Sequence, residues 1–150
     1  MTQLAEARVV EPIQDHAALE NARLVNQVRA ELLRSGTAVT IDAVAHTTGK
    51  SQAAVRRWVA RARNQHRLVT VTHDGQVYVP SFQLAPAFDT VDPLAAEIVA
   101  KLVDHGLDGW SVWDWFLAPN TWLGGEPPLG YLTAGDRDAL VRAVDGLTQG

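Results

Sequence analysis

The sequence predicts a mainly helical protein in two parts: three helices with a β-hairpin, then a small all-helical region. Two patterns predict this class. Apolar residues recur at helical spacing in several segments, whereas the stretch from Leu68 to Val79 is rich in Val, Thr and Tyr, as strands are. The charge also changes along the chain, because residues 1–82 carry an excess of three positive charges and residues 83–150 an excess of seven negative ones.

Composition excludes several classes of protein. The 150 residues are 47% hydrophobic and 20% charged, which is average for globular chains and excludes wholesale disorder. The absence of cysteine excludes disulfides, thiolate nucleophiles and zinc–cysteine sites. No uncharged apolar run approaches the roughly 18 residues of a membrane span, and no export signal is evident. We therefore expect a cytoplasmic protein.

The first predicted element is an amphipathic helix. Residues 1–14 show no sustained period and include Pro12, so they are expected to form a flexible leader. Asp15 can cap a helix that continues to Arg34 and ends before Gly36. Its apolar side makes it a candidate contact in a homodimer.

Two shorter helices follow. One begins after Thr40 and ends at Gly49, and the next begins at Ser51, whose hydroxyl suits an N-cap. Four apolar residues fall on one side of this helix, and its basic residues lie largely on the other. The apolar ones are Val55, Trp58, Val59 and Ala62.

A β-hairpin and a linker complete the first part. Asp74-Gly75 interrupts the strand-like stretch and suits a type I′ turn, which requires positive φ at both positions. Prolines and polar residues then indicate a linker over residues 83–91. The predicted domains are thus residues 15–82 and 92–150.

In the second part, Asp92-Pro93 is a strong helix opening, and that helix stops at Gly106. Ser111 and Asp114 resemble a capping box that begins a short helix. An irregular stretch rich in proline and glycine follows, and a last helix opens at Asp136.

The order of elements in residues 15–82 resembles a winged helix-turn-helix. Ala45, Gly49 and Val55 have the spacing of a helix crossing, a turn and a helix that packs back, and the hairpin resembles the wing. The basic run from Lys50 to Arg67 holds six cations and no acid, which is typical of phosphate contact. A solvated helix face, or pairing with acids of the second half, would produce the same run.

The expected DNA contacts fall into three groups. Arginine can bond guanine twice and glutamine adenine twice, so side chains early in the third helix can read base edges. Other cations would bind phosphates, and the wing tip would contact the duplex. The base-edge group is Ser51, Gln52, Arg56 and Arg57; the phosphate group is Lys50, Arg61 and Arg63; the wing-tip group is His73 and Gln76.

Four of the five tryptophans lie between Trp110 and Trp122, which indicates either a core or an interface. The segment from Trp115 to Leu132 resembles the toxin-binding domain of Xre/MbcA/ParS-like antitoxins, and the likeness covers about residues 92–150. Matching motif positions are Trp115, Pro119, Asn120, Leu123, Gly124, Gly125, Pro128, Leu129 and Leu132. Glu126 and Pro127 depart from the motif.

The resemblance implies an all-helical region that covers the active site of a RES-type, NAD-consuming toxin, and a protein that represses its own operon. The negative charge of this half would complement a cleft for an anionic dinucleotide. The prolines and glycines have a second explanation, since the chain must turn there. The expected toxin contacts are Trp115, Asn120, Trp122, Leu123, Gly124, Gly125, Arg137, Arg142 and Gly150.

Enzymatic activity is not expected. The five histidines lack metal-ligand spacing, and no phosphate loop, nucleophile elbow or dinucleotide fingerprint occurs, so no metal or cofactor is expected. The sequence favours an antitoxin that binds its toxin and operator DNA. Two alternatives stay open: a winged-helix transcription regulator whose second half dimerises or binds another protein, and an interaction adaptor with no DNA role.

Overall fold

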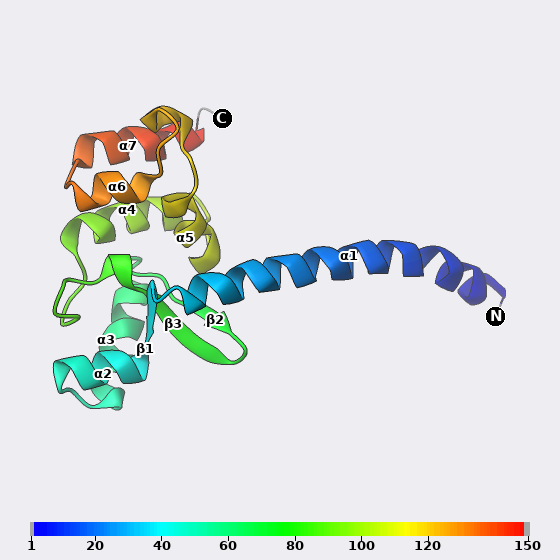
Figure 1. The fold of residues 1–150 in the computed structure, drawn as a ribbon, viewed down its shortest axis with the longest axis horizontal. Helices are drawn as coiled ribbons and strands as arrows, with labels where there is room; N and C mark the ends of the chain where they lie inside the picture. Colours follow the sequence, from blue (N-terminus) through cyan, green and yellow to red (C-terminus); the bar gives the residue numbers. More distant parts are fainter. Residues whose placement is uncertain (1, 149–150) are drawn as a thin grey trace. The chain divides into compact units, whose positions relative to one another are not determined.

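The computed structural model describes residues 2–148, with side chains from residue 16 onward. Within this range the fold is mainly helical, with seven α-helices and a small three-stranded antiparallel sheet, so the predicted fold class is confirmed (Figure 1). The chain divides into two units, Met1–Gly36 and Thr37–Gly150. The elements are α1 (Thr2–Arg34), β1 (Ala38–Thr40), α2 (Ile41–Thr48), α3 (Gln52–Asn64), β2 (Val71–His73), β3 (Gln76–Pro80), α4 (Pro93–Asp104), α5 (Gly109–Leu117), α6 (Pro128–Thr133) and α7 (Arg137–Asp145).

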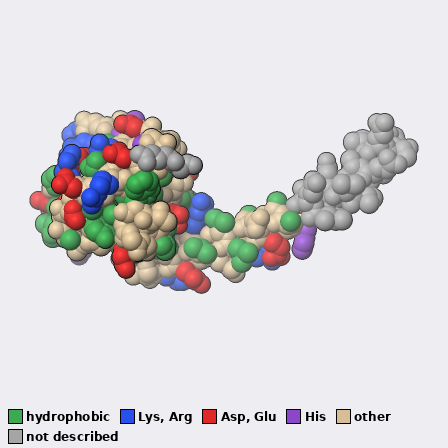
Figure 2. Space-filling view, turned by 90° about the horizontal axis from the view of Figure 1, so that it is seen from above, with side chains coloured by type: hydrophobic (Ala, Val, Ile, Leu, Met, Phe, Trp, Pro, Cys, Tyr) green, Lys and Arg blue, Asp and Glu red, His purple; other side chains and the backbone are tan. Residues whose placement is uncertain are grey.

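The first unit holds α1, which begins well before the predicted cap at Asp15 and includes Pro12. The predicted start is therefore wrong. Leu, Ala, Glu and Arg, all strong helix formers, are frequent before Asp15 and favour the longer helix. Large apolar side chains are exposed along the described part of α1, where green atoms are visible in Figure 2. They are Leu19, Leu24, Val25 and Val28. No helix among the described residues combines the length and apolarity that crossing a membrane requires.

Local signals correctly predict the helix pair α2–α3. The Thr40 hydroxyl accepts a hydrogen bond from the backbone N–H of Ala43, and the Ser51 hydroxyl accepts one from Ala54, so both residues are N-caps. Gly49 ends α2 with a φ of 73°, a left-handed conformation that glycine adopts without strain.

The hairpin is confirmed at the predicted turn. Asp74 and Gly75 have φ angles of 50° and 77°, and His73 pairs with Gln76 across the two-residue loop. Strand β1, which the sequence did not predict, pairs antiparallel with β3 and gives the strand order β1-β3-β2. This strand has only three residues and ends at Thr40, the N-cap of α2, which is too short to show a strand period. Only the pairing with β3 identifies it.

Residues from both predicted domains share one core. Residues of α2, α3 and the sheet form a buried cluster with Leu84 and Val91 from the expected linker and with Ala96 from α4. Within this linker Leu84 and Val91 form an isolated β-bridge. The backbone N–H of Ala85 also donates to the carbonyl of Thr90 at 2.9 Å. Residues 83–91 are thus an ordered, partly buried connection inside the second unit.

The C-terminal helices enclose a second core that also receives Val69, from the segment between α3 and β2. The openings at Asp92 and Asp136 are confirmed, because both carboxylates accept N-terminal helix amides. The predicted capping box at Ser111 is wrong, because α5 begins earlier and Asp108 caps it by accepting from the N–H of Ser111. Helix α6, which opens with Pro128, was not predicted, since the prolines and glycines that precede it indicated an irregular stretch.

Candidate functional site

Helix α3 presents a cationic surface. Val55, Val59 and Ala62 are buried in the first core, which turns the remaining faces of the helix outward. Four arginines on those faces are exposed, together with Lys50 in the preceding turn and Arg67 after the helix. We call these six side chains the α3 basic surface: Lys50, Arg56, Arg57, Arg61, Arg63 and Arg67.

The six cations have no direct acidic partners among the described residues. Among residues 16–148, no side chain of the α3 basic surface forms a salt bridge. The acidic half therefore does not neutralise this helix, although the helix and the acidic half belong to the same compact unit. Six exposed like charges within 18 residues attract anions and are poorly explained by internal packing.

A chain of polar side chains lies at the start of α3. The Asp42 carboxylate, on α2, accepts a hydrogen bond of 2.6 Å from the side-chain amide nitrogen of Gln52. The amide oxygen of Gln52 accepts one of 3.2 Å from Nη2 of Arg56. Ser51, the third expected base contact here, uses its hydroxyl as an acceptor in the N-cap described above.

The two expected DNA contacts at the tip of the hairpin differ in exposure. His73 is directed toward Asp74, with its Nε2 3.5 Å from the carboxylate, and only 13% of its side chain is exposed. Gln76 is exposed, and its amide donates weakly to the carbonyl of Val77 at 3.4 Å. The guanidinium of Arg63 donates a hydrogen bond of 3.4 Å to the hydroxyl of Thr70, the residue before β2. Gln76 is therefore the more accessible of the two expected wing contacts.

The loop expected to contact a toxin is held together by Asn120. Its side-chain oxygen accepts from the N–H of Trp122, and its carbonyl accepts from Leu123 and Gly125. Gly124 and Gly125 have φ angles of 66° and 86°, which explains glycine at both positions without any partner. Leu123 is buried against α7 residues. Four of the nine expected contacts thus have a structural role in this turn.

The other expected contacts differ in accessibility. Trp122 is 51% exposed, with its indole packed over Gly146 at the end of α7. Trp115 is half-buried, in edge-to-face contact with Phe116. Arg137 is already bound, because its guanidinium donates two hydrogen bonds to Glu97. Two residues remain: Arg142 is exposed, and Gly150 lies outside the described residues.

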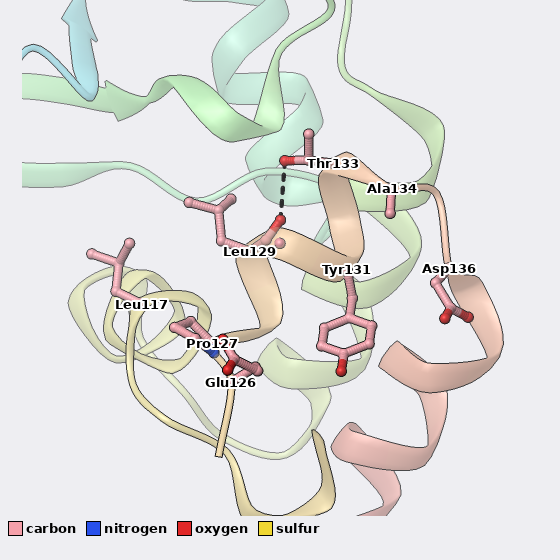
Figure 3. A pocket seen from close by; sticks show the side chains of 9 residues that line it. Leu117, Glu126, Pro127, Leu129, Tyr131, Thr133, Ala134 and Asp136 are labelled. Carbon is pink, nitrogen blue, oxygen red and sulfur yellow. Dashed lines mark hydrogen bonds between the residues drawn. The ribbon is translucent and has the colours of Figure 1, made fainter. Parts of the chain in front are cut away.

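An apolar groove of about 660 Å³ lies beside this loop, and none of its lining residues was among the predicted contacts. Figure 3 shows the side chains of α6, the end of α5 and the start of α7 around it. Tyr131 donates to the carbonyl of Leu123 at 3.4 Å, which ties the groove wall to the loop. The lining residues are Leu117, Glu126, Pro127, Leu129, Gly130, Tyr131, Thr133, Ala134 and Asp136.

Within the described residues no three His, Asp or Glu side chains are placed to share a metal ion. No family model and no curated protein matches the sequence. One solved structure that resembles this fold is the NMR structure of Rv2175c, with a TM-score of 0.56 and 21% sequence identity over 72% of this chain and 79% of that one. At this identity the likeness concerns the fold.

Proposed function

We propose that this protein is a DNA-binding transcription regulator in which α3 enters the major groove and the β2–β3 wing contacts the flanking backbone. The observation that carries the proposal is the α3 basic surface, whose six exposed cations follow a helix-turn-helix turn and lack acidic partners among the described residues. The phosphates of bound DNA would neutralise these cations.

Salt dependence tests this proposal. If four to six of these cations neutralise phosphates, the logarithm of the DNA association constant should fall with the logarithm of salt concentration with a slope of about −4 to −5. The double variant Arg56→Glu/Arg57→Glu should abolish binding. Arg142→Glu, a charge reversal at an exposed arginine of α7, is the control and should bind normally. A flat salt dependence of the intact protein would refute the proposal.

A second candidate function is that of an antitoxin whose C-terminal region binds a RES-type toxin and which represses its own operon. Two observations favour a protein partner for this region. Trp122, a residue type enriched at binding hot spots, is half exposed at the rim of the loop. The neighbouring apolar groove offers a concave site for a partner side chain. That the partner is a RES-type toxin is implied by the antitoxin motif that the segment from Trp115 to Leu132 resembles.

Co-expression with the product of the neighbouring gene, followed by affinity capture, tests this second function. Trp122→Ala and Gly130→Lys should weaken capture, since a Cβ at Gly130 meets no atom within 4 Å and a lysine there can enter the groove without disturbing α6. Arg56→Glu/Arg57→Glu should leave capture unchanged. Absence of any complex would reject the antitoxin function and leave DNA binding standing.

We further propose that the protein is a homodimer, as helix-turn-helix proteins that bind two-fold operators commonly are. The exposed apolar side chains of α1 supply the candidate contact, with Leu24 56% and Val28 64% exposed. Leu24→Lys/Val28→Lys should convert a dimer to a monomer in light scattering. A wild-type mass of one chain at micromolar concentration would contradict the dimer.

A further inference from the structure

We infer that Arg56 reads a guanine and that Asp42 and Gln52 position its guanidinium instead of reading bases themselves. This inference rests on the proposed DNA binding. The three side chains form one chain of hydrogen bonds, from Asp42 on α2 to Gln52 and then to Arg56 one turn further along α3. The chain therefore crosses the helix-turn-helix turn and ties the reading arginine to the bracing helix.

The chemistry of the three groups fixes the direction of these bonds. A carboxylate only accepts and a guanidinium only donates, so the amide nitrogen of Gln52 must face Asp42 and its oxygen must face Arg56. Each end of the amide then already holds one partner, which leaves one N–H and one oxygen lone pair. An adenine would have to share the amide with Asp42 and Arg56, whereas Arg56 uses one of its five N–H groups and keeps others for O6 and N7 of guanine.

Asp42 also places a negative charge beside the α3 basic surface, where it opposes the approach of phosphates. Its removal should therefore have two effects of opposite sign. Affinity for any duplex should rise, because one repulsive charge is gone. Preference for guanine at the base pair that Arg56 contacts should fall, because the guanidinium loses its support. A residue that only stabilises the fold would lower both quantities together.

The test uses the full chain and a preferred duplex selected from a randomised library. Arg56→Ala identifies its base pair by loss of guanine preference there, by about ten-fold. Asp42→Ala and Asp42→Asn remove the same charge, but asparagine keeps an oxygen that can accept from Gln52. Both should bind non-specific duplex more tightly. Only Asp42→Ala should lose guanine preference, by at least about three-fold, and Gln52→Ala should lose it at the same base pair.

Three results would overturn this inference. Equal guanine preference in Asp42→Ala and Asp42→Asn would show that the hydrogen bond is not used. Loss of an adenine preference at another base pair in Gln52→Ala would make Gln52 a direct reader. A library that yields no base preference would remove any reading by Arg56. Each of these leaves salt-dependent DNA binding intact, whereas failure of the wild-type protein to bind any duplex would remove the proposed function itself.

Discussion

Gln83 clamps the backbone of Val69. Its side-chain oxygen accepts from the N–H of Val69 at 2.7 Å, and its nitrogen donates to the carbonyls of Val69 at 2.9 Å and Pro80 at 3.1 Å. Gln83 is fully buried, so the three bonds satisfy polar groups that water cannot reach. Val69 lies in the segment after α3, and Gln83 lies at the start of the connection to α4. The clamp therefore fixes the segment after α3 to this connection.

Replacing Gln83 should strongly destabilise the protein. Gln83→Leu keeps approximate volume but leaves two carbonyls and one N–H buried without partners, which should lower the free energy of unfolding by about 2–4 kcal/mol. Urea unfolding measures this loss. Gln65→Leu, at an exposed glutamine, is the control and should change stability by less than about 0.5 kcal/mol. A similarly small loss for Gln83→Leu would mean that the clamp is not important for stability.

Gly109 should be intolerant of any side chain. A Cβ at this first position of α5 would overlap the carbonyl oxygen of Thr70, a backbone atom that cannot rotate away. Gly109→Ala should cost about 2 kcal/mol or more through overpacking.

Gly130→Ala is the matched control, because it is also a glycine in a helix but its new Cβ meets nothing within 4 Å. It should stabilise α6 by up to about 1 kcal/mol, the usual helix preference for alanine over glycine. Thermal unfolding of both variants checks the pair. If Gly109→Ala proved as stable as Gly130→Ala, the tight approach of α5 to Thr70 would be incorrect.

Much of the fold follows from local signals in the sequence. The caps at Thr40, Ser51, Asp92 and Asp136 each depend on a side chain that bonds an amide three residues away, and the Asp74-Gly75 turn depends on two φ angles. Such interactions are complete within a few residues. Sequence spacing can therefore predict them.

The features that sequence analysis missed depend on distant partners. Strand β1 forms because Val39 lies opposite Val79 on β3. Burial of Gln83 is tolerated because its amide forms hydrogen bonds with the backbone N–H and carbonyl of Val69. Competition between close alternatives also misleads, as where Asp108 caps α5 ahead of Ser111.

The candidate site also combines features with a local sequence signal and features that depend on distant partners. The exposed arginines of α3 follow from helical spacing, whereas the link between Asp42 and Gln52 requires α2 and α3 to be placed side by side. Similarly, the sequence identifies Trp122 and Arg137 as candidate toxin contacts, but only the structure shows that the guanidinium of Arg137 is bound to Glu97.

The ion pair between Glu97 and Arg137 should make stability depend on pH. Hydrogen bonds from Arg137, helped by its charge, lower the pKa of Glu97 from its ordinary value of 4.5. Because this pKa is lower in the folded protein than in the unfolded chain, the pair stabilises the fold above about pH 4.5. That contribution is lost as pH falls through the lowered pKa of Glu97. It should be modest, since both side chains are substantially exposed.

Glu97→Gln isolates this effect. At pH 7 the variant should unfold at slightly lower urea concentration than the wild type, because the charged pair holding α7 to α4 is gone. At a pH low enough to protonate Glu97 in the folded protein, the two unfolding curves should converge. Asp138→Asn, which removes a neighbouring carboxylate 3.9 Å from Arg137, should leave the pH dependence of Glu97 in place. A difference between Glu97→Gln and wild type that is the same at neutral and acidic pH would show that the charge of Glu97 is not what stabilises this contact.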